Sequence, residues 1–552
     1  MSDYTIQKEA SRIFHDVLLQ DARLGLPKEV IEAASRTIVD EETPIAKPFL
    51  PAPTKASETS TALWALLATY GNVLAQQRFG ITQTVTVNSD LATIFIFAFM
   101  LTKFGDKSIG DPDIVPRYQK YDLAKQYLPW RRLCTNVYPT KDGRWFHTHA
   151  SLDANKTLQM LGLPTSDDEK DELKIIGRYC DKLREYDAAW LDLEANEHWR
   201  QAGCIALTKE EYLASEHGKV VAHDPIYLVE AFQDERLPPV PWPQVDNSTT
   251  FRPLEGIKIL DLTRAIAGPT IARLAALFGA TVVRISHEQL SELGAILVES
   301  NLGKVDVNLD LKSDAGRQTL LRLLEDADVL LDGFRPGALD RLGFGPKYVH
   351  ELARRRGRGL VYARENCYGW GGPLSHRSGW QMISDAVVGL SWEMGKFVGL
   401  DEPIVPPLPN ADFQTGIIGC LGIMNALDRR AREGGNYLVS MSLNQYNSFL
   451  LSVGSQPADI QAGLQEKWKD MNFRHYDNMN RILRKLIPAF PEKVPELFSP
   501  AYFEKISADW GTPGEELTIL KPVVKYEKTE LKYDYGSTEK GKHPAEWPSQ
   551  QL

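Results

Sequence analysis

The sequence predicts an α/β fold built around a doubly wound parallel sheet, and three observations point to it. Short apolar runs suited to buried strands alternate with helical patterns after residue 254. Pro-rich passages at residues 41–57 and 237–253 are typical of linkers, because proline fixes φ and removes a hydrogen-bond donor. The 552 residues exceed what one compact core usually holds, so we expect two or three domains.

The predicted elements of the sheet follow one another after the second linker. Residues 257–262 (IKILDL) predict a buried strand, and residues 268–278 a helix whose Pro269 is tolerated in the first turn. After Gly279, residues 281–285 (TVVRI) predict a second strand. The remaining elements are a strand at 305–311, a helix at 316–324 and strands at 329–331 and 359–362. This alternation favours parallel strands joined by helical crossovers.

The first half of the chain contains a faint copy of a later segment. Residues 67–91 predict a helix, a break, a strand and another helix, and residues 418–444 predict the same order. A degenerate duplication explains this better than chance does. Within the first half, residues 91–101 (LATIFIFAFML) are too short to span a membrane and predict a buried helix.

Composition excludes several classes of protein. With 63 Lys and Arg against 73 Asp and Glu, the net charge of -10 disfavours a general nucleic-acid binder. The five cysteines form no CxxC pair, which argues against a disulfide framework or a thiolate zinc site. His147 and His149 lack an evident third ligand, so we expect no metal. The N-terminus lacks the apolar stretch of a secretory signal, so we expect a cytoplasmic protein that does not bind membranes.

Six segments in the second half together resemble the family III (CaiB/BaiF-like) CoA-transferases, which include relatives of α-methylacyl-CoA racemase. They are residues 254–269 (LEGIKILDLTRAIAGP), 278–284 (FGATVVR), 303–311 (GKVDVNLDL), 332–345 (DGFRPGALDRLGFG), 368–373 (YGWGGP) and 411–416 (ADFQTG). Each segment alone is weak, but all six occur in the family's order over about 190 residues. Residues 138–146 (YPTKDGRWF) are similar to the entry of the family's smaller domain.

The resemblance implies an abbreviated tandem chain of family III. It implies a Rossmann-like sheet with a smaller α+β domain, and it divides the chain into four parts. These are a helical arm and linker (1–57), the rear half of one copy including the smaller domain (58–250), a Rossmann-like CoA-binding domain (254–450), and a divergent C-terminal region and tail (451–552). Family members form interlocked dimers, so a homodimer is an open expectation.

The resemblance also implies that CoA, as an acyl-CoA substrate, binds the second half. The backbone of Ala267, Gly268 and Pro269 at a helix start would face the diphosphate. The residues expected to supply positive charge or to stack on the adenine are Arg284, Lys304, Arg335 and Phe334.

Structural interpretations of the same residues stay open. Gly268 would relieve crowding between helix and strand, and Phe334 would belong to the core. Arg335 would pair with Asp332 or Asp340.

The family's catalytic aspartate is replaced in this chain. In the family motif GYDxxxQA, the Asp attacks the acyl-CoA carbonyl and forms an anhydride and then an aspartyl-CoA thioester. Here residues 379–386 read GWQMISDA, so Gln381 stands at that position, and an amide cannot take this role. Asp385, one helical turn later, or Glu365, after the strand at 359–362, is the candidate replacement. His376 is the nearest candidate for acid–base chemistry.

Three functions remain open at this point. The first is CoA transfer between an acyl-CoA thioester and a small carboxylic acid. The second is isomerisation, as in an acyl-CoA racemase, or another non-covalent reaction of the bound thioester, in which Gln381 would bind the thioester carbonyl. The third is a catalytically inactive acyl-CoA-binding protein.

Overall fold

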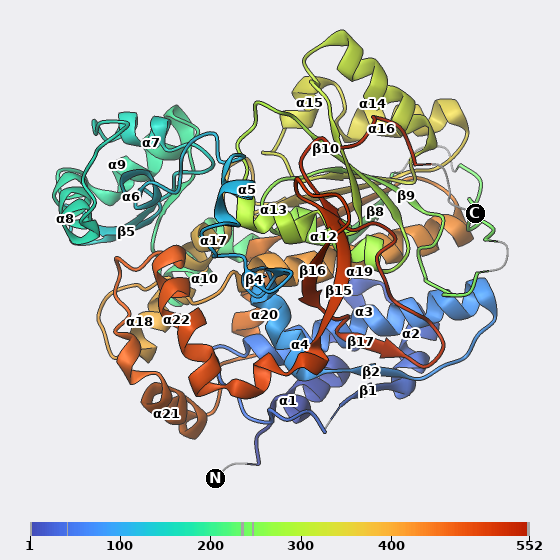
Figure 1. Ribbon diagram of the computed structural model, residues 1–552, viewed down its shortest axis with the longest axis horizontal. Coiled ribbons are helices and arrows are strands. Elements are labelled where there is room, and N and C mark those ends of the chain that lie inside the picture. Colours follow the sequence, from blue (N-terminus) through green and yellow to red (C-terminus); the bar gives the residue numbers. More distant parts are fainter. Residues whose placement is uncertain (1–2, 41, 233–236, 246–247, 549–552) are drawn as a thin grey trace.

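The computed structural model describes residues 3–40, 42–232, 237–245 and 248–548, and its centre is a seven-stranded sheet (Figure 1). The strands run in the spatial order β11-β10-β9-β12-β13-β14-β8. Their bounds are β8 Tyr227–Ala231, β9 Lys258–Leu262, β10 Thr281–Ser286, β11 Lys304–Asn308, β12 Val329–Asp332, β13 Val361–Asn366 and β14 Tyr437–Ser442. All neighbours pair in parallel except β8, which lies antiparallel to β14. The predicted doubly wound parallel sheet is confirmed.

Helices cover both faces of this sheet. Along β9, Ile259 enters the larger hydrophobic core and Leu260 the other, because successive side chains of a strand point to opposite faces. The larger core packs α12 (Ala267–Leu277) and α19 (Asn410–Glu433) against the sheet. The second core packs α14 (Asp314–Asp326) and α16 (Pro346–Arg356).

The two similar segments fold with the same order of elements. The first segment contains α3 (Ala56–Phe79), β2 (Val85–Val87) and α4 (Ser89–Ile94). These correspond in order to α19, β14 and α20 (Leu443–Ser452) of the second segment. Both long helices end at a glycine with positive φ, Gly80 and Gly434, where an L side chain would be strained. The strands join different sheets, because β2 pairs with β1 (Thr37–Val39) and β17 (Val524–Tyr526). α3 packs against α19, so the two segments share one core.

A smaller α+β unit lies to one side of the sheet, at the upper left of Figure 1. Its antiparallel strands are β5 (Asn136–Pro139), β6 (Trp145–Thr148) and β7 (Gly203–Ile205). They share a core of their own with α8 (Glu172–Leu183) and α9 (Ala188–Leu193). β7 touches α17 (Gln381–Val388), where the Sγ of Cys204 lies 3.6 Å from the carbonyl oxygen of Ile383. The smaller unit therefore borders the helix that carries Gln381 and Asp385.

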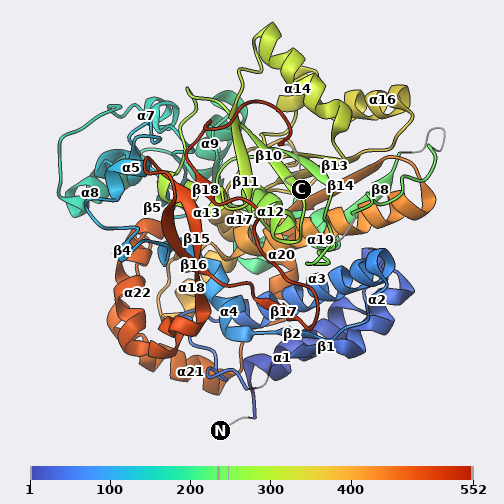
Figure 2. The ribbon, with the colours of Figure 1, turned by 45° about the vertical axis from the view of Figure 1, so that its right-hand side comes forward.

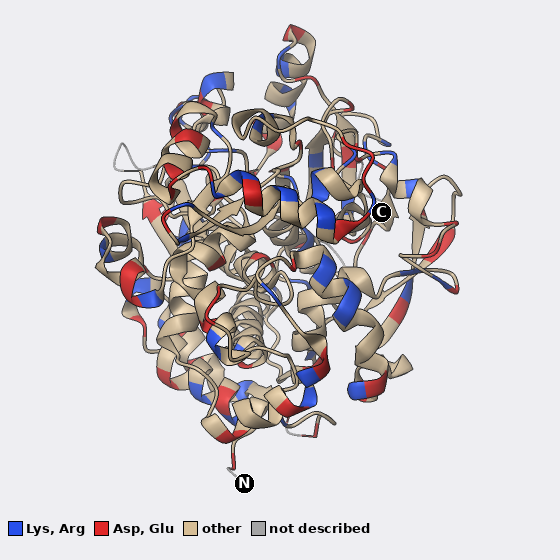
Figure 3. Ribbon diagram, turned by 90° about the vertical axis from the view of Figure 1, so that its left-hand side faces the viewer, with Lys and Arg blue, Asp and Glu red and all other residues tan. Residues whose placement is uncertain are grey.

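The apolar segment 91–101 is buried, as predicted. It forms α4 and a short 3-10 helix, Phe95–Met100. Within the described ranges, no helix combines the length and the apolar character that crossing a bilayer requires. Lys and Arg are interspersed with Asp and Glu over the ribbon in Figure 3.

Candidate active site

The sheet has its topological switch point between β9 and β12, where ligands bind in doubly wound folds. The loops that follow these two strands meet tightly there. A Cβ atom on Gly268 would lie 2.6 Å from the Cβ of Thr263, and one on Gly333 3.1 Å from it. Both glycines therefore permit a close approach of the two loops. Gly268 therefore relieves crowding between α12 and the loop after β9, which is the structural role considered above. Its backbone remains a predicted contact for the diphosphate.

The predicted phosphate-binding segment forms the first turn of α12. Ala267, Gly268 and Pro269 are buried, and no side chain caps this end of the helix. Ala265, two residues before the helix, has φ 72°, a left-handed conformation that costs a residue with a side chain about 1–3 kcal/mol. Backbone strain of this kind is often found where a loop is shaped for a ligand.

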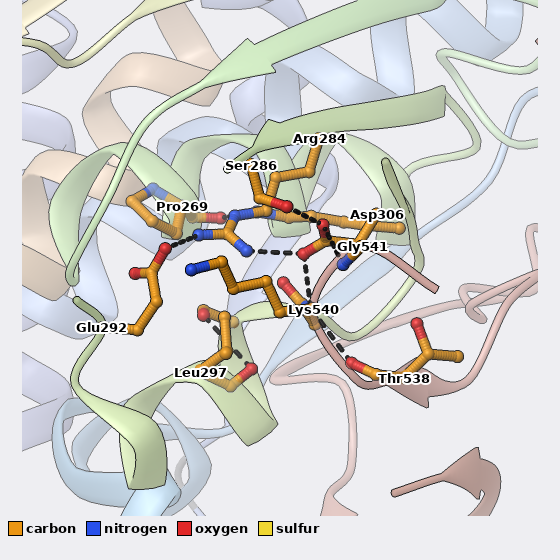
Figure 4. A network of polar contacts seen from close by, with 12 residues as sticks. Pro269, Arg284, Ser286, Glu292, Leu297, Asp306, Thr538, Lys540 and Gly541 are labelled. Carbon is orange, nitrogen blue, oxygen red and sulfur yellow. Dashed lines mark hydrogen bonds and ion pairs between the residues drawn. The ribbon is translucent and has the colours of Figure 1, made fainter. Parts of the chain in front are cut away.

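Two of the predicted cationic ligands are engaged inside the protein. Lys304 is fully buried, and its Nζ lies 2.7 Å from the Oδ2 of Asp261 and 2.8 Å from the carbonyl oxygen of Pro269. Burial lowers the pKa of Lys304 to about 8, against the opposing attraction of Asp261. Arg284 is also buried and holds both Asp306 and Glu292 (Figure 4). To bind CoA, each would have to give up these partners, so their ligand role stays a prediction.

The other two predicted ligands lie nearer to solvent. Arg335 is exposed and donates to the carbonyl of Arg200 at 3.0 Å. Within the described ranges it forms no ion pair with a carboxylate, and this includes the Asp332 and Asp340 pairs considered above. Phe334 is half-buried and packs against the second core, with its backbone N–H bonded to Asp332.

The sequence analysis missed Arg264, which stands in the loop between β9 and α12. Its Nη2 donates to the carbonyl oxygen of Ser291, and its Nε lies 3.9 Å from Glu292. Burial lowers its pKa, and the neighbouring Arg284 and Arg335 lower it further. Arg264 and Arg335 therefore bring positive charge to the switch point from two adjacent loops. The signal was present in the LTRAIAG segment, where Arg264 is the second residue after the end of the strand.

α17 brings Gln381 and Asp385 together, as their spacing predicts. Gln381 is the first residue of this helix, and its amide Nε2 donates to the Oδ2 of Asp385. Asn447 of α20 donates to the Oδ1 at 2.9 Å. Asp385 is 2% exposed, and burial raises the pKa of its carboxyl from 3.8 to about 8 although both hydrogen bonds lower it. Asn447 was not foreseen, because its segment carries no recognisable motif.

These polar groups form part of the wall of a small pocket. Gln381, Asp385 and Asn447 line it together with Asn410. Its apolar walls come from distant parts of the chain: Leu50, Pro53, Ile96, Met394, Leu408 and Leu450. A pocket with apolar walls and a few convergent polar groups is suited to a small organic ligand.

Glu365, the other candidate nucleophile, is the last residue but one of β13 and lies near a different carboxylate. Burial, together with the charges of Asp412 and Asp332, raises its pKa to about 8. Asp412 lies in the first turn of α19, and both burial and Asp385 raise its pKa. Asp412 is therefore within electrostatic reach of both predicted candidates. Asp412 stands in the ADFQTG segment, but the sequence alone did not connect it with Glu365.

His376 is not brought to these carboxyl groups. Its Nε2 lies 2.9 Å from the Oε2 of Glu197 in the smaller unit, and the His376 side chain is 59% exposed. The adjacent Arg377 binds Glu197 and Asp192. This part of the loop therefore joins the two units of the protein. In the part of the chain that is described, no cluster of His, Cys, Asp or Glu has the composition of a metal site.

Comparison with known proteins identifies similar chains along the whole length. The sequence model for CoA-transferase family III matches residues 254–476. An acetyl-coenzyme A transferase of Hypoxylon pulicicidum is 38% identical, and the alignment covers 99% of this chain and 94% of the relative. An acyl-CoA transferase of Gibberella moniliformis is 30% identical over 89% of this chain and 87% of its own length.

Similarity to solved structures is more limited. A CaiB/BaiF family protein from Brucella suis is 22% identical, with a TM-score of 0.38. The match covers 53% of this chain and 97% of that protein.

Proposed function

The chain belongs to CoA-transferase family III, and we propose that it transfers CoA from a short acyl-CoA to a carboxylic acid with Asp385 as the nucleophile. The observation that carries the proposal is the pocket at α17. It contains Asp385 one turn from the family's catalytic position, held by the amides of Gln381 and Asn447.

The proposed reaction uses the ionised carboxyl group of Asp385. Its oxygen attacks the thioester carbonyl, the C–S bond breaks, and CoA leaves as a thiolate while a mixed anhydride forms on Asp385. The thiolate then attacks the aspartyl carbonyl of that anhydride, releasing the first carboxylate and leaving an aspartyl-CoA thioester. The acceptor carboxylate repeats the two steps in reverse order and departs as the new thioester. Electrons and atoms balance, and no proton needs a separate donor.

The amides of Gln381 and Asn447 have two roles in this scheme. Their N–H groups hold the two carboxyl oxygens and fix the direction of attack. They also offset part of the cost of ionising a buried carboxyl group, because hydrogen bonds to the charged form favour it.

A short acyl group suits the pocket. The pocket is small, and Leu50, Ile96 and Met394 form part of its apolar wall. The relative from Hypoxylon pulicicidum is named an acetyl-coenzyme A transferase, which agrees with an acetyl or similarly short donor.

The same family membership supports a proposal about chain organisation. We propose that residues 58–250 and 254–450 are the rear half of one copy and the front of the next, between an arm at 1–57 and a divergent region at 451–552. The matching order of elements in α3–β2–α4 and α19–β14–α20 supports this.

The test is intact-protein mass spectrometry after incubation with acetyl-CoA, with hydroxylamine to intercept the covalent intermediates. The wild type should carry a CoA or acyl adduct that Asp385→Asn lacks and the matched variant Glu365→Gln retains. Loss of the adduct in Glu365→Gln alone would assign the nucleophile to Glu365. Acetyl-CoA binding without any adduct would reject covalent transfer. Solvent deuterium at the α-carbon of the substrate would then indicate isomerisation, and its absence an inactive binding protein.

A further inference from the structure

The C-terminal tail, residues 521–548, runs across the molecule and covers the open edge of the large sheet (Figure 2). It first adds β17 to β2, and Asp534 then pairs with the buried Arg252 at 2.9 Å. Further on, the backbone N–H of His543 donates to the carbonyl of Asp306 in the edge strand β11 at 3.0 Å. An edge strand left open is prone to pair with other chains, so the tail has an evident structural role.

One stretch of the tail also enters the carboxyl edge of the sheet. The N–H of Gly541 donates to the Oδ1 of Asp306 at 2.8 Å (Figure 4). The Nζ of the adjacent Lys540 lies 2.5 Å from the carbonyl oxygen of Leu290. Arg264 donates to the next carbonyl along, that of Ser291. Two cations from distant parts of the chain therefore hold neighbouring carbonyls of the loop after β10.

Positive charge exceeds negative charge at this place. Glu292 is nearest to both cations but already forms an ion pair with Arg284 at 2.8 Å, and Asp306 is likewise held by Arg284. In the described part of the chain, Lys540 forms no ion pair with any carboxylate. Burial lowers its pKa against the opposing attraction of Glu292, and the charges of Arg284 and Arg264 also lower it. A cluster of cations of this kind is stabilised when an anion binds it.

We propose that Lys540 of the C-terminal tail is a ligand for the phosphate groups of CoA, acting with Arg264 and Arg335 at the switch point of the sheet. The inference rests on the proposed function and adds a binding residue that lies outside the residues 254–476 matched to the family. The ammonium group acts as a point charge toward phosphate oxygens, and the two guanidinium groups act as forks. Bound CoA would then link the C-terminal tail to the loops of the sheet through its phosphate groups.

The test compares the binding of three ligands by isothermal titration calorimetry. Lys540→Met keeps the aliphatic stem and removes the charge, and Lys542→Met is its matched control, because Lys542 pairs with Asp509 at 3.1 Å on the same tail. Lys540→Met should raise the Kd for CoA about tenfold, the effect of one charge-assisted hydrogen bond. The control should leave this Kd unchanged. Pantetheine, which has no phosphate, should bind wild type and Lys540→Met equally.

Dephospho-CoA decides which phosphate is involved. If Lys540→Met still weakens its binding about tenfold, the lysine contacts the diphosphate; if the weakening disappears, it contacts the 3′-phosphate. Hydrogen exchange supplies an independent readout on the wild type, since CoA but not pantetheine should slow exchange at residues 537–543.

An unchanged Kd for CoA in Lys540→Met, or an equal loss of pantetheine binding, would overturn the inference. Lys540→Arg keeps the charge and should bind CoA within about threefold of wild type, which separates a charge effect from a folding defect. If Lys540→Met does not fold, unchanged exchange at residues 537–543 on CoA binding overturns the inference on the wild type alone. Failure of the wild type to bind CoA at all would instead reject the proposed function, and the inference with it.

Discussion

Replacing Asp385 with asparagine should remove the covalent adduct and at the same time stabilise the fold in a pH-dependent way. Burial raises the pKa of this carboxyl group from 3.8 to about 8, so the folded state retains a proton that the unfolded chain loses near pH 4. Stability from this group is therefore fully present below pH 3.8 and is lost as the pH rises toward 8. Asparagine has a similar shape and no charge to bury, so its contribution does not change with pH.

The magnitude follows from the shift in pKa. Each pH unit between the two values costs the wild type about 1.4 kcal/mol, so this group loses about 4 kcal/mol between pH 5 and pH 8. That figure is an upper bound, because burial rarely acts at full strength. Urea unfolding of wild type and Asp385→Asn at pH 5, 6.5 and 8 measures the difference in free energy of unfolding, in which all other titrating groups cancel. The free energy of unfolding of Asp385→Asn should increase relative to that of the wild type from pH 5 to 6.5 and again from pH 6.5 to 8.

A constant difference across this pH range would refute the reasoning, because it would mean that Asp385 is ionised in the folded state at neutral pH. The same pKa predicts that about one tenth of the enzyme carries an ionised nucleophile at pH 7. The rate of adduct formation should accordingly rise about tenfold per pH unit up to about pH 7 and level off above pH 8. A rate that is flat from pH 6 to pH 9 would contradict Asp385 as the nucleophile.

Three other outcomes follow from the same geometry. The double variant Gln381→Asp/Asp385→Gln, which restores the family order, should regain an adduct, and peptide mapping after hydroxylamine trapping should locate it at position 381; no adduct would show that the two positions are not equivalent. Lys304→Met should lower the free energy of unfolding by about 3–5 kcal/mol, because Asp261 loses its buried partner. An unchanged Kd for CoA in the folded variant would reject the predicted ligand role of Lys304. A weaker Kd by calorimetry would instead make Lys304 a ligand. Met394→Ala should widen the pocket and shift the ratio of kcat/KM for butyryl-CoA over acetyl-CoA upward by about tenfold, and an unchanged ratio would place the acyl group elsewhere.

The parallel sheet could be predicted because apolar periodicity is local. Each strand that the second half of the chain contributes to the sheet was visible in the sequence as a short apolar run, and α12 and α14 had helical spacing. The single charged residues within those strands were harder to interpret. Arg284 lies directly opposite Asp306 on one neighbouring strand and Asp261 on the other. Their pairing depends on the register between strands, and the sequence alone does not fix it.

The candidate site could be predicted only in part, because its members come from distant segments. Asp385 and Gln381 share one helix, so their proximity followed from helix geometry. Asn447 and the pocket wall at Leu50 reach the same place through tertiary packing, for which the sequence has no local signal. The position of Lys540 is even harder to predict from the sequence, since 250 residues separate it from Leu290, whose carbonyl it contacts.

The relation between Gln381 and Asp385 explains why the family nucleophile can move without losing its partner. The family motif has Asp at the first position and Gln at the fifth, and this chain has the two exchanged, so one amide and one carboxyl group still face each other across a single helical turn of about 6 Å. The environment of the carboxyl group differs between the two positions. The first residue of a helix lies at the positive end of the helix dipole, which favours a carboxylate. One turn further in, Asp385 is buried in the wall of a largely apolar pocket, and burial raises its pKa to about 8. The exchange therefore keeps the same pair of groups and would make the charge on the proposed nucleophile depend on pH in the neutral range.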